Sequence, residues 1–148
     1  MKIVLLISWT VISLILTAGC GESGPAMSVS GVQVIAPAPG RKASVAYFTI
    51  HNRGSNAVVL NGVTSPQFGR VEMHETVLEM GIARMRPLAS LKVDARSSVE
   101  LAAGGKHLML SEPVKVLLPD SPVSLHLQFA SEFSLIVQTL IKTRHSID

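Results

Sequence analysis

The fold class is decided by the stretch Val123-Ser124-Leu125-His126-Leu127-Gln128-Phe129, near the end of the 148-residue chain. Apolar and polar residues alternate strictly along it. Because successive side chains on a β-strand point to opposite faces of the sheet, the apolar residues share one face, and Ser124, His126 and Gln128 share the other. The pattern predicts a strand with one buried and one solvated face.

Eight further segments of similar length surround this strand, separated by turns rich in Pro, Gly and Asn. No apolar pattern with a 3.6-residue period persists long enough to indicate a helix. Short strands with regularly spaced turn signals are typical of sandwiches and barrels, so we expect an all-β, Greek-key β-sandwich. The expected strands are Val32–Ile35, Ser44–Asn52, Val58–Val63, Val71–Val77, Ile82–Arg86, Ser98–Leu101, Lys106–Leu110 and Phe133–Ile141.

The N-terminal segment has the features of an export signal. Lys2 is followed by the apolar run Ile3–Leu16, which is short for a membrane span but has the length of a signal-peptide core. The run leads into Thr17-Ala18-Gly19-Cys20, which resembles the lipobox of bacterial lipoproteins except that Thr17 replaces the usual Leu. The resemblance implies that Cys20 is acylated and becomes the first mature residue; the alternative is an uncleaved membrane anchor. We therefore expect a periplasmic protein that is lipid-anchored to a bacterial membrane.

The chain then divides into four segments. We expect a signal peptide at residues 1–19, a lipidated flexible tether at 20–30, one β-sandwich domain at 31–142 and a short tail at 143–148. The tether is assigned from its small polar residues. A domain of this size is large enough for a single hydrophobic core.

Cysteine content and charge exclude several classes of function. Cys20 is the only cysteine, so a lipidated chain has no thiol for a disulfide, a zinc-thiolate site or a nucleophile. Loss of Lys2 with the signal peptide leaves 12 of the 13 basic residues against 10 acidic ones, without a basic stripe or stacking aromatics. We expect no nucleic-acid partner. Because the chain has no Gly-x-Ser-x-Gly elbow and no Gly-rich loop that opens a helix, we also expect no enzymatic activity.

Two segments place histidine and methionine together at strand spacing. In His107-Leu108-Met109, the imidazole and the thioether point to the same face because residues two apart on a strand do so. The second segment, Val71–Pro87, is expected to form a hairpin centred between Glu79 and Met80. In that register His74 lies directly opposite Met85, with Cβ atoms about 5 Å apart.

The same hairpin register has consequences for the neighbouring residues. Glu75 would face Arg84, which is a favourable charge pair. Met73 falls on the face opposite to His74 and is interpreted as a core residue. Met80 sits at the turn and is the rival of Met85 as a ligand.

Two imidazoles and two thioethers select a soft metal. Thioether sulfur is a poor ligand for Mg²⁺, Ca²⁺ or Zn²⁺ but suits Cu(I), and imidazole accepts copper in either oxidation state. We therefore predict a Cu(I) site formed by His74, Met85, His107 and Met109. A blue-copper electron-transfer site is excluded because it needs a cysteine thiolate.

The spacing His74-x10-Met85-x21-His107-x-Met109 resembles the motif of the periplasmic copper chaperones of the PCuAC family. The runs Ala46–Asn52, Met85–Pro87 and Gly104–Leu110 are similar to that family too, and the resemblance covers about residues 32–141. It implies a cupredoxin-like β-sandwich that holds Cu(I) near its surface. It also implies delivery of Cu(I) to the binuclear copper site of cytochrome c oxidase, with subunit II of that enzyme as a partner.

Two other functions remain open on the sequence alone. The first is a copper-scavenging or resistance lipoprotein with the same site and no dedicated acceptor. The second is an adhesion or assembly module in which the His and Met residues are incidental. The remaining histidines, His51, His126 and His145, are interpreted as surface residues.

Overall fold

The computed structural model describes residues 26–38 and 40–143, so the expected signal peptide, Cys20 and His145 lie outside the described residues. The described chain forms ten β-strands and no helix that is long and apolar enough to cross a membrane. The strands are β1 (Met27–Ile35), β2 (Ser44–Asn52), β3 (Val58–Thr64), β4 (Phe68–Glu79), β5 (Ile82–Leu88), β6 (Leu91–Val93), β7 (Ser97–Leu101), β8 (Lys106–Pro113), β9 (Pro122–Phe129) and β10 (Ser134–Lys142).

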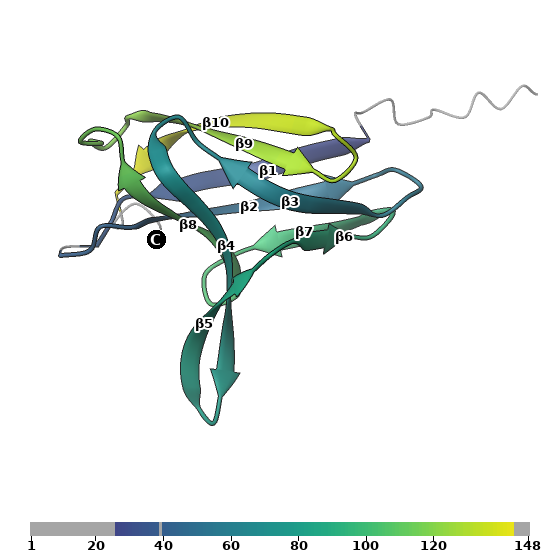
Figure 1. Cartoon of the computed structure of the whole chain (residues 1–148), viewed down its shortest axis with the longest axis horizontal. Coiled ribbons are helices and arrows are strands. Elements are labelled where there is room, and N and C mark those ends of the chain that lie inside the picture. The colour runs from purple at the N-terminus through teal and green to yellow at the C-terminus, as the bar shows by residue number, and fades with distance from the viewer. Residues whose placement is uncertain (1–25, 39, 144–148) are drawn as a thin grey trace, which may run out of the picture.

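The strands form two layers that are joined at one edge (Figure 1). One layer has the order β5-β4-β8-β2-β1, and the other has the order β10-β9-β3-β6. Strand β2 pairs with β8 through its first residues and with β7 through its last. A short parallel ladder between β1 and β10, which pairs Val34 with Ile141, connects the two layers.

Consecutive strands repeatedly change layers. The chain leaves the first layer after β2, pairs β3 with β9, and then returns to the first layer as β4. It crosses again between β8 and β9. These crossings are the long connections of a Greek-key sandwich, so the prediction of an all-β fold is confirmed.

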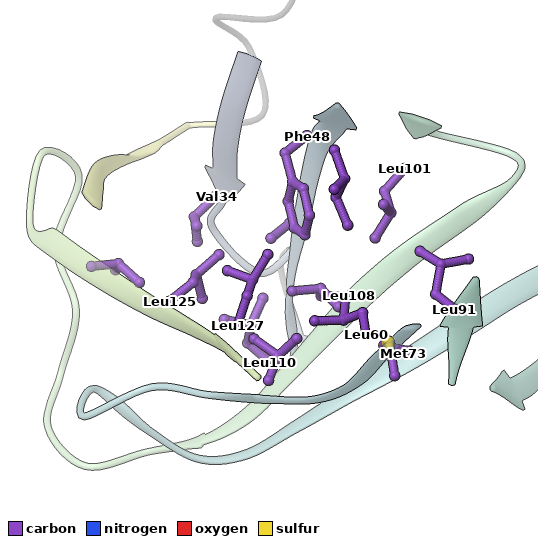
Figure 2. Packing of buried hydrophobic residues seen from close by; sticks show 14 of the residues in the cluster. Val34, Phe48, Leu60, Met73, Leu91, Leu101, Leu108, Leu110, Leu125 and Leu127 are labelled. Carbon is purple, nitrogen blue, oxygen red and sulfur yellow. The ribbon is translucent and has the colours of Figure 1, made fainter. Parts of the chain in front are cut away.

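The core lies between the layers and is largely aliphatic. Strands β2 and β9 show alternating burial along their length, as their sequence alternation predicts. Figure 2 shows side chains from both layers meeting there, including Val34, Leu108 and Leu125, all fully buried. Leu108 separates His107 from Met109 along β8, and its burial fixes which way both of those residues point.

The predicted strands are all present, but one boundary and one omission need correction. Strand β1 begins at Met27, inside the expected tether at 20–30, and pairs with β2 from Met27↔Asn52 to Ser30↔Thr49. The small polar residues of this stretch therefore form the outer face of a strand. Strand β6 was not predicted, because three residues are too few for a periodic pattern.

The β4–β5 hairpin projects from the body of the sandwich (Figure 1), and its predicted register was wrong by two residues. The turn consists of Met80 and Gly81, with φ of 51° and 77°, and Glu79 pairs with Ile82. A two-residue hairpin turn of this kind needs positive φ at both positions, which glycine adopts most readily. Gly81 therefore belongs in the turn and not in the strand. Because the shift is even, every side chain keeps its predicted face.

Candidate metal site

Three neighbouring strands bring the predicted donors together. Strand β4 pairs with β8 so that His74 lies directly opposite His107, and their ring centroids are 6.0 Å apart. On the other side, β4 pairs with β5. Met85 lies opposite Thr76, whereas the predicted register placed it opposite His74. Because Thr76 and His74 share a face, Met85 still points to the same side as both histidines.

His107 is held in one orientation by the backbone. Its Nδ1 lies 3.0 Å from the carbonyl oxygen of Gly105, which also accepts a hydrogen bond from the Thr76 amide at 3.1 Å. A carbonyl only accepts, so the proton of the neutral ring sits on Nδ1. This assignment leaves Nε2 with a free electron pair, and Nε2 lies 3.3 Å from the Sδ atom of Met85.

The ring of His74 is without a hydrogen-bond partner among the described residues. Both ring nitrogens are buried and neither makes a hydrogen bond to any described residue. The nearest acidic atom is Oε2 of Glu72, at 3.8 Å from Nε2, which is too long for a hydrogen bond. Glu72 is instead bound by Arg70 at 2.7 Å, and this hydrogen bond holds the pKa of the Glu72 carboxyl below its usual range.

Met109 lies on the same face as the other three predicted ligands. It is two residues beyond His107 on β8, is half-buried, and lies opposite Glu72 on one side and Val45 on the other. Within the described part of the chain, no three His, Cys, Asp or Glu side chains gather in one place. The cluster therefore consists of two imidazoles, with the thioether of Met85 beside His107 and Met109 on the same face.

The two other methionines that the sequence singled out lie elsewhere. Met73 is 7% exposed and packs in the core on the opposite face of β4, as predicted. Met80 is fully exposed at the tip of the hairpin. Six extended residues separate it from His74, which corresponds to about 20 Å along the strand. Met80 is therefore too distant to share an ion with His74 in this structure.

The charge pairs around the site differ from the predicted one. Glu75 was expected to face Arg84, but in the observed register it binds Lys106 on β8 at 2.7 Å. Arg84 and Arg86 both contact Glu79, next to the turn. These ion pairs lie on the face of β4 opposite to His74. The Glu75–Lys106 pair joins β4 to β8, and the pairs of Glu79 join β4 to β5.

The hairpin also carries exposed apolar residues at and near its tip. Leu78 is 77% exposed, Ile82 59% and Met85 60%, and Met80 lies between them at the turn. Apolar side chains grouped in this way on a soluble domain commonly mark an interaction surface.

The sequence did not reveal Glu72, Thr76 or Gly105 as neighbours of the site. Glu72 and Thr76 are each two residues from His74, so strand alternation alone places them on its face. Gly105 acts through its carbonyl oxygen, which no residue pattern shows. Of the histidines interpreted as surface residues, His126 is half-buried on the polar face of β9, and His51 binds Ser30 and Ser98.

The fold is similar to that of several solved domains. The copper-bound PCuAC domain from PmoF2 superposes with a TM-score of 0.66 at 18% identity, covering 80% of this chain and 94% of that domain. The CuI-DR1885 protein of Deinococcus radiodurans gives a TM-score of 0.63 at 24% identity, covering 88% of this chain and 85% of that protein. At these identities the likeness concerns the fold, and the expected cupredoxin-like architecture is confirmed.

Sequence comparison identifies the family. A relative from Leifsonia xyli subsp. xyli, named "Putative lipoprotein Lxx21020", is 31% identical over 110 residues, which are 72% of this chain and 66% of the relative. The chain thus spans slightly less than two thirds of that relative's length. The family described as "Putative lipoprotein LpqE-like" matches residues 27–140, nearly the whole described domain. The chain therefore belongs to the LpqE-like family.

Proposed function

We propose that this protein is a periplasmic copper chaperone that binds Cu(I) through His74, Met85, His107 and Met109 and delivers it to a copper protein. The fold supports the proposal, since copper-bound domains of the same architecture are known. The role is to bind and transfer the metal, which is the cargo of the protein, and no catalytic step is involved.

The observation that carries the proposal is the set of imidazole nitrogens without hydrogen-bond partners. Burying a polar nitrogen without a partner costs about 1–3 kcal/mol, so such groups are rare in a fold unless a ligand satisfies them. Both ring nitrogens of His74 are of this kind. On the opposite strand, the free electron pair of His107 Nε2 faces the thioether of Met85.

The spacing of these two atoms suits a shared ion. A nitrogen and a sulfur bound to one tetrahedral metal at about 2.0 and 2.3 Å lie about 3.5 Å apart. The distance between Nε2 of His107 and Sδ of Met85 is already 3.3 Å. Because the ring proton is on Nδ1, no hydrogen lies between these two atoms. A cation between them would turn this repulsion of electron pairs into two coordinate bonds.

Donor softness favours Cu(I) as that cation. Thioether sulfur is a poor ligand for hard ions such as Mg²⁺ and Ca²⁺, whereas Cu(I) binds both thioether sulfur and imidazole nitrogen. Met85 is 60% exposed, so the site opens at the surface, where a second protein can reach the ion. The exposed apolar tip at Leu78, Met80 and Ile82 is the surface on which we expect an acceptor to dock.

The acceptor and the location are part of the same proposal. The resemblance of the motif to that of the PCuAC family implies the binuclear copper site of cytochrome c oxidase as the destination of the ion. The lipobox-like sequence before Cys20, together with the name of the Leifsonia relative, supports a lipid anchor on the periplasmic face of a membrane. Scavenging of excess copper by the same site is the second candidate, because the same four ligands would hold the ion without a dedicated acceptor.

X-ray absorption of the protein loaded with one equivalent of Cu(I) tests the ligand set. We expect mixed nitrogen and sulfur scattering, because two imidazoles and two thioethers form the proposed shell. A spectrum with only nitrogen and oxygen neighbours would mean that Met85 and Met109 do not bind the metal.

A protein that competes no better than buffer for Cu(I) would favour the adhesion or assembly module. Oxidase activity of a deletion strain at limiting copper separates delivery from scavenging.

A further inference from the structure

A cavity of about 360 Å³ lies where β2 ends and β7 begins. It is lined by the end of β2 and the start of β7, with the residues His51, Asn52, Arg53, Arg96, Ser97 and Ser98. None of these lining residues is one of the four predicted copper ligands. The cavity is therefore separate from the copper ligands.

The backbone around the cavity is fixed by one buried side chain. Asn52 is 2% exposed, and its Nδ2 donates to the carbonyl oxygens of Asn56, Val93 and Asp94 at 2.8, 3.2 and 3.0 Å. Its Oδ1 accepts from the Gly54 amide at 3.0 Å. One amide group thus ties the loop after β2 to the turn before β7, the two segments that carry the arginines.

The lining presents hydrogen-bond donors without an acidic partner. Its residues include two guanidinium groups and no carboxylate. The nearest acidic residue in the turn, Asp94, is bound to Lys92 at 2.7 Å. His51 forms the adjoining wall and is held there by hydrogen bonds with the hydroxyls of Ser30 and Ser98.

Arginine side chains in this setting recognise oxyanions. The planar guanidinium matches phosphate oxygens through two parallel hydrogen bonds, and two such groups at one rigid opening bind better than scattered lysines. Arg96 has a φ of 52°, which is unfavourable for a residue other than glycine and is often found at functional positions.

The position of the cavity points to a source for the phosphate. The amide of Arg53 donates to the carbonyl of Ala26 at 2.8 Å, so the opening lies beside the point where the chain enters the fold. Cys20 is six residues earlier, a length of chain that reaches at most about 20 Å. If Cys20 carries lipid, as proposed above, the cavity lies within reach of the membrane surface.

We propose that this cavity, defined by Arg53 and Arg96, binds a phosphate group, the chemistry shared by a phospholipid headgroup and free phosphate. Binding to headgroups would hold the end of the anchored domain formed by β2 and β7 against the bilayer.

The lipid arm of the test uses the chain from Cys20 onward with Cys20→Ala, which keeps every described strand and lacks the acylation site. Its partitioning onto phosphatidylglycerol vesicles is measured by sedimentation. Replacing both arginines, Arg53→Gln with Arg96→Gln, should weaken partitioning roughly 30-fold, about 5-fold per charge. Arg41→Gln with Lys42→Gln is the matched control, because it removes the same two charges before the start of β2, beyond a Debye length of about 8 Å from the surface. Equal weakening by this control would show diffuse attraction and overturn the headgroup source.

The phosphate arm follows the backbone amides of Gly54, Arg96 and Ser97 by NMR as inorganic phosphate replaces chloride at constant ionic strength. Saturable shifts that disappear in the double variant support the cavity as a phosphate site. Shifts with free phosphate but no vesicle binding assign free phosphate as the source, and vesicle binding alone assigns the headgroup. The absence of both overturns the proposal. The Cu(I) affinity of the double variant should equal that of the parent. Loss of phosphate binding is therefore distinguished from loss of the copper site.

Discussion

The two histidines of the candidate site contribute differently to the metal-free fold. The ring of His107 donates to the carbonyl of Gly105, and this hydrogen bond stabilises the protein whether or not a metal is bound. The ring of His74 makes no hydrogen bond within the described ranges, 26–38 and 40–143, and is buried at the cost of its hydration. The sequence alone makes the two residues look equivalent.

This difference predicts opposite effects of the same substitution. His74→Leu should leave the free energy of unfolding of the apo protein unchanged or raise it by about 1 kcal/mol, because an unpaired buried polar group is removed. His107→Leu should lower it by about 1 kcal/mol through the lost hydrogen bond. Both should abolish tight Cu(I) binding. Urea denaturation and Cu(I) competition measure the two effects, and a loss of apo stability in His74→Leu would contradict the description of its ring as unpartnered.

The hairpin offers a matched pair of methionines for testing the soft donor. Met85→Leu should lower Cu(I) affinity by more than about 100-fold, since it removes a direct donor and not only a supporting group. Met80→Leu makes the same chemical change on the same hairpin and should have little effect. Both side chains are exposed, so neither variant should change the unfolding free energy by more than about 0.5 kcal/mol. If Met80→Leu weakened copper while Met85→Leu did not, the proposed ligand set would be wrong.

Among the structural elements, the β4–β5 hairpin combines an unfavourable turn residue with a well-paired stem. Met80 occupies a left-handed position, with φ of 51°, where asparagine or glycine is usual. Its apolar side chain is fully exposed as well. Neither feature favours stability, which is consistent with a role for the tip in contacting another protein.

Met80→Asn should therefore strengthen the hairpin, because Asn-Gly is the preferred sequence for a turn of this type. We expect the unfolding free energy to rise by about 0.5 kcal/mol, with Cu(I) affinity unchanged. Gly81→Ala is the opposing control and should lower stability by about 1 kcal/mol. Denaturation curves of the parent protein, Met80→Asn and Gly81→Ala measure the three unfolding free energies. A destabilised Met80→Asn protein would show that Met80 makes contacts that this structure lacks.

Local patterns predicted which residues share a face of the hairpin but not which residues are opposed. Alternation assigned His74, Met85 and His107 to one side correctly, and it put Met73 in the core. The direct pairing of His74 with His107 joins strands that are separated by β5, β6 and β7. No local signal specifies so distant a register, since it results from packing of the whole layer.

At the scale of the whole molecule, the proposed lipid anchor is tested by a substitution of Cys20. Cys20→Ala should release the protein from the membrane or leave it unprocessed, because a multiply acylated cysteine gains about 0.8 kcal/mol for each buried CH₂ and does not dissociate. Fractionation of cells into membrane and soluble parts measures this, with processing followed by mass. A variant that stays in the membrane fraction with the mature mass would contradict the lipid anchor.

The existence of most strands was predictable from the sequence, whereas the arrangement of the layers was not. Val123–Phe129 shows its buried face by alternation alone. The division of β2 between β8 and β7 depends on residues far along the chain. The start of β1 was missed because Ser28 and Ser30 resemble a linker, although Ser30 binds His51 in the structure.

The parallel pairing of β1 with β10 has a consequence for how the chain folds in time. The Thr139 hydroxyl donates to the carbonyl of Val32 across 107 residues of sequence, so the first and last strands meet only when nearly the whole chain is available. Contacts between distant parts of a sequence form slowly, because closing the intervening loop costs entropy before any contact compensates for it. Folding is therefore completed late, after the C-terminal strand has left the ribosome. Until then β1 keeps an open edge, and the chain does not reach its final tertiary structure.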